Sequence, residues 1–397
     1  MESLSTTETA ITKNIPQLRF PEFDGEWKKS SLENLSEKKI SYGIVQTGER
    51  IQNGVPCLRV IDLTKSNIIM NELITTSLKI SNSYKKTILE KDELMIALRG
   101  IIGRTQIVTE ELAGFNLTRG IARVSPDDKI ILPKYLLKYL NSPESHKNFD
   151  KRKNGSALKE IPISELRKFP VKFPSFPEQQ KIANFLTQVD RKIELLENQQ
   201  AALEQYKKGV MQKIFNQEIR FKIKNEAGEL VEPPDWEEKK LGEIASKKSS
   251  SISANQIEDN EGEYKIYGAT GFFKKVDFYK EKEKFISIVK DGAGVGRVLL
   301  CDEFSSVLGT LDILKPKREV NLYFLYSILQ LMNFLKFKIG STIPHIYFKD
   351  YSKAVIKIPS IEEQDKIANF LSAIDTKIEA VAEGSRSHRK WKKGLLQ

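Results

Sequence analysis

The sequence predicts a mixed α/β protein of the α+β type, in which two similar globular units are separated by two long helices that form a coiled coil; if this coiled coil is antiparallel, a pseudo-two-fold axis relates the units. Three observations predict this pseudo-two-fold repeat. A helical segment occurs twice, each copy follows a stretch of short strand-like runs, and each copy carries apolar residues with heptad spacing. Strand-like and helix-like segments do not alternate regularly, so a doubly wound parallel sheet is not expected.

The repeated segment begins at Pro174 and again at Pro359, 185 residues later. The first copy reads Pro-Ser-Phe-Pro-Glu-Gln-Gln-Lys-Ile-Ala-Asn-Phe-Leu, and ten of these thirteen positions are identical in the second. The same separation holds further along, in the pairs Asp190 and Asp375, and Lys207 and Lys392. This period is far too long for a solenoid, so it indicates a duplicated unit of one domain and one helix.

Each globular unit begins with a tryptophan and two apolar residues, which we expect to be core anchors. These are Trp27, Leu32 and Leu35 in the first unit, and Trp236, Leu241 and Ile244 in the second. Strands are expected at Val55–Ile61, Leu94–Leu98, Gln106–Val108, Tyr264–Tyr267, Phe285–Val289 and Arg297–Leu300. Helical stretches follow at Tyr135–Leu140 and Leu322–Leu331, and a last strand ended by proline at Val171–Pro174 and Ile356–Pro359.

The two long helices each carry an apolar stripe that needs a partner surface. The residues expected at the coiled-coil or subunit interface are Ile182, Phe185, Val189, Leu196, Leu203, Tyr206 and Val210, with Ile367, Phe370, Ile374, Val381, Trp391 and Leu395. A single-domain core helix is the ordinary alternative. The segment Gly384–His388 favours helix poorly, and the second copy ends sooner than the first, so we expect the second helix to be less stiff.

Composition favours a polyanionic partner. The 397 residues carry a formal charge of +11, which suits nucleic acid, although a basic protein without such a partner would look the same. Cys57 and Cys301 are the two cysteines, so neither a disulfide framework nor a cysteine metal cluster is expected. Residues 1–20 are polar and no apolar run approaches a membrane span. A bacterial cytoplasmic protein is the expectation.

Motifs for chemistry are weak, and we expect no catalytic, cofactor-binding or metal-binding residues. The stretch 291–297 is rich in glycine but lacks the spacing and the lysine of a phosphate-binding loop. It shares a Gly-Arg pair after a strand with residues 99–104, which predicts a tight turn near a phosphate or base edge, or a plain turn. Asp235, Glu263 and Lys265 loosely fit a nuclease pattern, which we interpret as accidental.

Candidate DNA contacts come from basic residues at matching positions and from segments that differ between the units. A solvated basic face is the alternative for the lysines. The candidates are Tyr42, Gln46, Thr47, Arg99, Arg104, Lys151, Lys153 and Ser156 in the first unit, and Tyr267, Thr270, Lys290, Arg297, Lys336, Lys338 and Ser341 in the second.

The repeated Glu-Gln-x-Lys-Ile-Ala-Asn-Phe-Leu segment, its Lys-Lys-Gly ends and the Lys-Ile-Tyr-Gly-Ala-Thr-Gly and Gly-Arg signals resemble the specificity subunit of type I restriction-modification enzymes. The resemblance covers essentially the whole chain. It implies target recognition domains at 16–173 and 219–358, a central conserved helix at 174–218 and a distal one at 359–397. Each domain would read one half of a gapped, asymmetric DNA site.

The resemblance further implies a non-catalytic chain that binds double-stranded DNA, two methyltransferase subunits and restriction subunits. S-adenosylmethionine would be bound by the methyltransferase subunit, and Mg and ATP by the restriction subunit, with no cofactor on this chain. Two other functions stay open at this point. One is a stand-alone or fused DNA-cleaving enzyme that uses Asp235, Glu263 and Lys265, and the other is a non-specific nucleic-acid adaptor.

Overall fold

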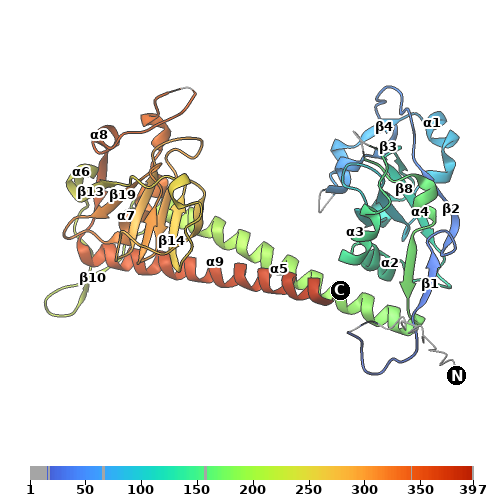
Figure 1. Cartoon of the computed structure of the whole chain (residues 1–397). Coiled ribbons are helices and arrows are strands. Elements are labelled where there is room, and N and C mark those ends of the chain that lie inside the picture. The colour runs from blue at the N-terminus through green and yellow to red at the C-terminus, as the bar shows by residue number, and fades with distance from the viewer. Residues whose placement is uncertain (1–15, 17, 65–67, 156–158, 341, 396–397) are drawn as a thin grey trace, which may run out of the picture. The chain divides into compact units, whose positions relative to one another are not determined.

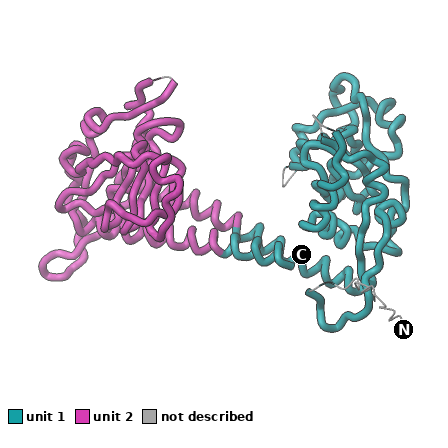
Figure 2. The backbone as a smooth tube through the Cα atoms, in the orientation of Figure 1, with its two compact units in different colours: residues 1–196, 384–397 teal, residues 197–383 magenta. Residues whose placement is uncertain are grey.

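A computed structural model describes residue 16 and residues 18–64, 68–155, 159–340 and 342–395. Contacts within the chain define two compact units, which are coloured separately in Figure 2. Unit 1 comprises residues 1–196 and 384–397, and unit 2 comprises residues 197–383. Each of the two long helices therefore contributes one part to each unit, and the units are described separately below.

Unit 1 contains three sheets whose strands come from distant parts of the chain. The four-stranded sheet has the order β2 (Ser36–Tyr42), β8 (Ile121–Pro126), β5 (Leu94–Ala97), β6 (Thr105–Ile107). The three-stranded sheet has the order β4 (Ile74–Thr76), β3 (Val55–Leu58), β7 (Asn116–Leu117). The third pairs β1 (Lys28–Ser31) with β9 (Pro170–Phe173) in antiparallel register. Buried β5 and β8 place the core under the first sheet.

Unit 2 repeats this strand order, although its sequence differs. The four-stranded sheet is β13 (Ala245–Ser249), β19 (Leu311–Pro316), β16 (Phe285–Val289), β17 (Val298–Cys301). The three-stranded sheet is β15 (Gly271–Val276), β14 (Tyr264–Gly268), β18 (Ser305–Val307), and β12 (Glu237–Lys240) pairs with β20 (Val355–Ile358). A short hairpin of β10 (Ile223–Lys224) and β11 (Leu230–Val231) precedes them. The duplication therefore includes the whole globular part and not only the helix.

Short helices fill the connections. They are α1 (Leu78–Ser83), α2 (Pro133–Leu140), α3 (Pro143–Asp150) and α4 (Ile163–Arg167) in unit 1, and α6 (Leu241–Ile244), α7 (Leu322–Leu331) and α8 (Phe348–Tyr351) in unit 2. The 3-10 turns are η1 (Val60–Thr64), η2 (Met70–Glu72), η3 (Lys85–Thr87), η4 (Glu110–Leu112), η5 (Asn255–Ile257) and η6 (Phe334–Phe337). The mixed fold class and the strand and helix segments expected from sequence are confirmed, with one exception.

The exception is the run Val55–Ile61, whose strand stops at Leu58. Residues from Val60 form the turn η1 instead. The buried carboxylate of Asp62 accepts a hydrogen bond from the Arg59 main-chain nitrogen at 2.7 Å and two from its guanidinium. This local side-chain bonding competes with the strand ladder, which the apolar pattern alone does not reveal.

The two long helices are α5 (Phe176–Phe215) and α9 (Ile361–Leu395), drawn in green and red in Figure 1. In unit 1 the side chain of Leu196 faces Gly384, and Phe185 packs edge-on against Trp391 at 5.7 Å, so this part of α9 runs antiparallel to α5. In unit 2, residues of both helices join one hydrophobic core. None of the described helices combines the length and hydropathy that crossing a membrane requires.

Two ion pairs repeat the same interaction with the helices exchanged. In unit 1 Lys392 of α9 reaches Asp190 of α5 at 2.5 Å, and in unit 2 Lys207 of α5 reaches Asp375 of α9 at 2.7 Å. Both lysines and both aspartates are related by the 185-residue repeat. Each helix thus contributes one lysine and one aspartate to these two ion pairs.

Gly384–His388, which favours helix poorly by itself, lies within the continuous helix α9. The helix continues to Leu395, and Ser385 within this segment is buried. A Cβ added at Gly384 would come within 3.7 Å of the Leu196 side chain, an ordinary contact distance. Packing against α5 therefore stabilises a segment that its intrinsic helix propensity would not.

The Glu-Gln pair of each repeat fixes the long helix to its domain. Gln179 accepts a hydrogen bond from the Leu132 main-chain nitrogen at 2.9 Å and donates to the carbonyl oxygens of Ile130 and Pro174. Gln364 makes the same set with main-chain atoms of Asn321, Glu319 and Pro359. Because all these partners are main-chain groups, the attachment does not depend on neighbouring side chains.

The glutamates of the same pair are fully buried. The Glu178 carboxylate accepts hydrogen bonds of 2.7 and 2.8 Å from the guanidinium of Arg19. It accepts a further one of 3.3 Å from the Trp27 indole nitrogen. Unit 2 repeats this triad with Glu363, Arg220 and Trp236. Each glutamate thus ties the segment that enters the domain to the first turn of the long helix.

Replacing Asp190 by Asn should lower stability at neutral pH and leave it unchanged near pH 2. Burial opposes ionisation of Asp190, but hydrogen bonds from Lys138 and Lys392 outweigh it and hold the pKa below its usual value. A carboxyl group with a lowered folded-state pKa contributes stability above its unfolded pKa of about 3.9 and loses it as the pH falls through the folded value. We expect a loss of about 1–2 kcal/mol at pH 7. Urea unfolding at several pH values checks this, and an equal loss at pH 2 would contradict it.

Candidate nucleic-acid interface

The two Gly-Arg pairs form the same tight turn, which joins an inner strand of each four-stranded sheet to the neighbouring edge strand, β5 to β6 and β16 to β17. Gly103 and Gly296 have φ of +83° and +85°, and each main-chain nitrogen donates to the carbonyl of the preceding strand, at 2.9 and 2.8 Å. A Cβ at Gly103 would lie 2.4 Å from the Phe149 ring, and one at Gly296 would lie 2.6 Å from Phe334. The predicted turn is confirmed, and only glycine fits there.

The arginines of these turns hold a neighbouring connection. The Nε atom of Arg104 donates to the carbonyl oxygen of Leu63 at 3.3 Å, and an Nη atom of Arg297 donates to that of Ala269. Leu63 belongs to the β3–β4 connection and Ala269 to the corresponding β14–β15 turn. Both arginines are exposed, yet part of each guanidinium is already engaged with the main chain.

In each unit, main-chain hydrogen bonds close a loop that lies between the Gly-Arg turn and the last strand in the sequence. Asn154 and Glu160 exchange two main-chain hydrogen bonds of 2.9 and 3.0 Å, and Ile339 and His345 exchange two of 2.9 Å. The residues that follow these loops donate to Leu98 and Lys290, at the end of the same sheet as the turn. The structure therefore brings the predicted basic segments together in each unit. Ser156 and Ser341 lie outside the described residues.

The predicted cations lie at the end of the four-stranded sheet beside the Gly-Arg turn, and only some of them are paired with a carboxylate. Lys153 pairs with Asp150, and Lys290 lies 3.3 Å from the buried carboxylate of Asp312. Arg99, Lys151, Lys336 and Lys338 are exposed. Within the described part of the chain none of these four forms an ion pair, so their charges face solvent and suit phosphate contacts.

Replacing Lys336 and Lys338 by Ala should weaken DNA binding equally for all sequences. Each phosphate contact contributes about 0.9 to the slope of log K against log salt, so the slope should fall by about 1.8. A salt series of fluorescence anisotropy titrations measures it. Replacing Lys213 and Lys377 by Ala is the control, because it removes the same amount of charge from exposed positions on α5 and α9. An unchanged slope in the test variant would contradict the phosphate contacts.

The segment Tyr42 to Thr47 lies at the corresponding end of β2. Tyr42 pairs with Ala122 and so stands level with the end of β5. Its side chain is 42% exposed, and Gln46 is also exposed. The Thr47 carbonyl oxygen accepts a hydrogen bond from the Thr76 hydroxyl at 2.6 Å. A Cβ at Gly43 would overlap the Leu117 carbonyl oxygen at 2.0 Å, so this strand end approaches β7 too closely for any other residue.

Tyr267 was predicted to contact DNA, but the structure places it in a hydrophobic core. Its side chain is 8% exposed within an unit 2 core, and its hydroxyl donates to Asp302 at 2.9 Å. Burial raises the pKa of this hydroxyl. We therefore assign Tyr267 to the core, whereas Thr270 two residues beyond β14 is exposed at the turn.

The predicted interface residues of the long helices also differ in burial. Val189, Val210, Ile367 and Ile374 are buried, whereas Tyr206 and Trp391 are about half exposed, at 53% and 49%. The others are half-buried: Ile182, Phe185, Leu196, Leu203, Phe370, Val381 and Leu395. The helix pair therefore keeps aromatic surface in contact with solvent.

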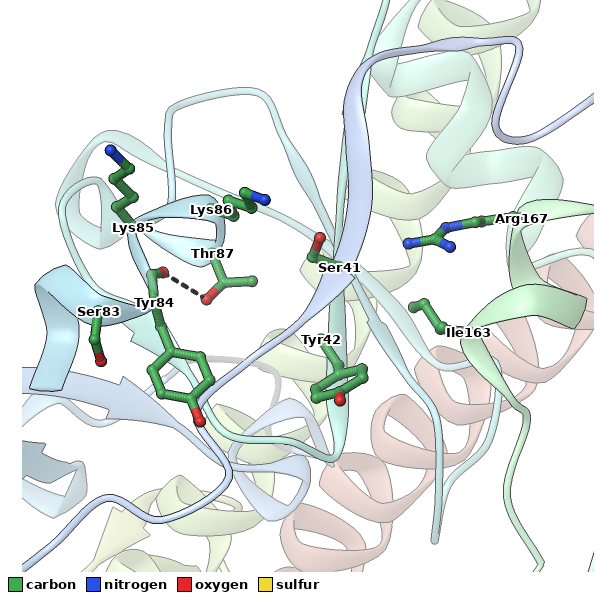
Figure 3. Close-up of a pocket in the computed structure, with 9 residues that line it drawn as sticks. All are labelled: Ser41, Tyr42, Ser83, Tyr84, Lys85, Lys86, Thr87, Ile163 and Arg167. Carbon is green, nitrogen blue, oxygen red and sulfur yellow. Dashed lines mark hydrogen bonds between the residues drawn. The ribbon is translucent and has the colours of Figure 1, made fainter.

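A shallow cavity of about 340 Å³ lies in unit 1 next to Tyr42 (Figure 3). Tyr84, Lys85 and Lys86 also line it, and sequence reasoning did not single them out. Arg167 at its wall donates to the Ile40 carbonyl oxygen at 2.7 and 3.2 Å. Tyr42 and Tyr84 contribute two aromatic rings to its lining, both labelled in Figure 3.

One residue of the nuclease pattern is engaged elsewhere. Lys265 forms an ion pair with Asp302 at 2.6 Å, and Asp235 and Glu263 are exposed. Among the described residues there is no group of His, Cys, Asp and Glu side chains that could hold a metal ion.

Comparison with known proteins gives consistent matches. The model of the type I restriction modification DNA specificity domain matches residues 22–205 and again 233–384. The EcoBI specificity subunit of Escherichia coli is 27% identical over 251 residues, which are 61% of this chain but only 52% of that relative. The putative MjaX specificity subunit of Methanocaldococcus jannaschii is 26% identical, over 97% of this chain and 95% of its own length.

Solved structures show the same fold. The type I restriction-modification S subunit from M. genitalium superposes with a TM-score of 0.65 at 18% identity, covering 97% of this chain and 98% of that chain. A second structure, from a study of complex assembly and conformational transition of the type I system, gives a TM-score of 0.56 at 16% identity. At such identities the likeness concerns the fold alone.

Proposed function

The chain belongs to the type I restriction-modification DNA specificity family, and from this premise we propose that it is the sequence-specific, non-catalytic DNA-binding subunit of a type I complex. One observation carries the proposal beyond family membership. The same three-sheet fold occurs twice, with exposed cations at the same end, while the residues at that end differ. Two such domains suit two different half-sites.

We propose that each domain reads one half of a gapped, asymmetric site and that the helix pair sets the spacing. The rigidity needed for this is supported by helices of 40 and 35 residues, each fixed to a domain by a buried glutamate. At 1.5 Å per residue the longer helix extends about 60 Å, more than one turn of B-DNA.

The half-exposed side chains on the long helices support docking of methyltransferase subunits in this proposal. Leu195, Tyr206 and Trp391 are 56%, 53% and 49% exposed, and large exposed apolar side chains are enriched where proteins meet. Such subunits would bring S-adenosylmethionine, and restriction subunits would bring Mg and ATP. This chain would supply sequence reading and assembly.

Binding of duplex DNA in competition with random duplex tests the proposal. The full chain should retain a specificity ratio of at least about 10³ for its site as salt is raised, because base contacts persist while phosphate contacts weaken. Equal loss of binding to both duplexes would support a non-specific adaptor. Cleavage of plasmid by the purified chain with Mg²⁺, abolished in Glu263→Ala, would support the nuclease.

A further inference from the structure

Two neighbouring phenylalanines are exposed beside the β14–β15 turn of unit 2. Phe272 is 55% exposed and Phe273 48%. The hairpin is tight, since Gly268 pairs with Gly271, whose φ is +110°. The pairing shifts register at Phe273, between the pairs Tyr267–Phe272 and Ile266–Lys274, so the two exposed rings lie at a bulge beside the tip of this ribbon.

The corresponding connection in unit 1 is longer but also exposes apolar side chains. It joins β3 to β4 through residues 59–73. Ile61, Ile69 and Met70 within it are 60%, 46% and 41% exposed. The two domains thus place different apolar groups at one equivalent position, as expected of a segment that distinguishes two DNA sequences.

The Gly-Arg turn holds this connection in both units. Arg104 donates to Leu63 and Arg297 to Ala269, and both acceptors are main-chain carbonyl oxygens. In unit 2 the same turn is also bonded to the basic loop, because the Gly292 nitrogen donates to the Pro344 carbonyl at 2.9 Å. The turn therefore lies between the ribbon tip and the loop that follows Lys336 and Lys338.

We propose that the β14–β15 ribbon enters the major groove and reads bases through apolar contacts of Phe272 and Phe273, with Arg297 as a positioning residue. The inference rests on the proposed DNA-reading function. A two-stranded ribbon fits the major groove, and an apolar side chain there contacts the thymine methyl group. The nearby exposed lysines favour a polyanion over an apolar protein surface as the occupant.

Selection from a randomised duplex pool, with the full chain in complex with its methyltransferase subunits, tests the ribbon. The double variant Phe272→Ala, Phe273→Ala should lose about tenfold discrimination at one or two base pairs in one half-site. The other half-site should be unchanged. Phe304→Ala is the matched control, because Phe304 is 45% exposed but lies next to Ser305, which pairs near the start of β14 and so at the far end of the ribbon.

The outcomes separate this inference from the function on which it rests. If the wild-type complex selects a gapped site and the double variant selects it with equal discrimination, the ribbon does not read bases, and the proposed function stands. If the wild-type complex selects no sequence, both fail. Loss of discrimination in Phe304→Ala as well would also overturn the assignment.

Arg297→Ala distinguishes a positioning role from a phosphate contact. A positioning residue should relax discrimination at the same base pairs as the phenylalanines, with an unchanged slope of log K against log salt. A fall of the slope by about one would show that Arg297 binds phosphate and would overturn its positioning role.

Discussion

Exchange of residues 16–170 for the matching region of a relative with a different target should replace one half of the recognised site and preserve the other. The expected change is complete, because all described unit 1 residues at the candidate interface lie within the exchanged segment. Gln179 of the resident helix binds only main-chain atoms of the incoming domain, and Glu178 needs an arginine and a tryptophan at the positions of Arg19 and Trp27, so the relative is chosen to carry both.

Methylation mapping with the chimaera measures this outcome. The reciprocal exchange in unit 2 is the matched control and should alter the opposite half. If both half-sites remained the same, or both changed, the division of reading between the two domains would be wrong.

Replacing Glu363 by Ala should destabilise unit 2 by about 3–5 kcal/mol. The carboxylate is fully buried and receives Arg220 and the Trp236 indole, and it raises the pKa of that arginine through the hydrogen bond. Removing the buried Glu363 leaves the partly buried guanidinium of Arg220 and the Trp236 indole without their acceptor, which costs far more than the loss of an exposed pair. The segment entering the domain would also lose its link to α9.

Denaturant unfolding, followed by tryptophan fluorescence, measures the loss, since Trp236 is buried at this site. Glu362→Ala is the control, because Glu362 is the preceding residue of the same helix turn and is exposed. Its effect should stay within about 0.5 kcal/mol. A similar small effect for Glu363→Ala would mean that the buried triad does not stabilise the domain.

The repeat in the sequence predicted the parts of the fold that depend on identical residues. Asp190, Lys207 and their counterparts keep both identity and separation, and the structure uses them in reciprocal ion pairs. The Gly-Arg turns were predictable for a related reason, since Phe149 and Phe334 leave no space for a side chain at Gly103 and Gly296.

Other features depend on tertiary contacts that no local pattern reveals. The same strand order arises in two domains of different sequence because burial, not residue identity, defines β5 and β16. Gly384 remains helical because Leu196 packs beside it. Tyr267 resembled a surface contact in a Gly-containing segment, but Asp302, far along the chain, satisfies its hydroxyl in the core.

Single-molecule methylation mapping of DNA modified by the complex that contains this chain tests the central claim most directly. The account predicts one asymmetric motif whose two halves are separated by a fixed number of unread base pairs. A continuous motif, a palindromic motif read by two equivalent domains, or modification without any motif would contradict it.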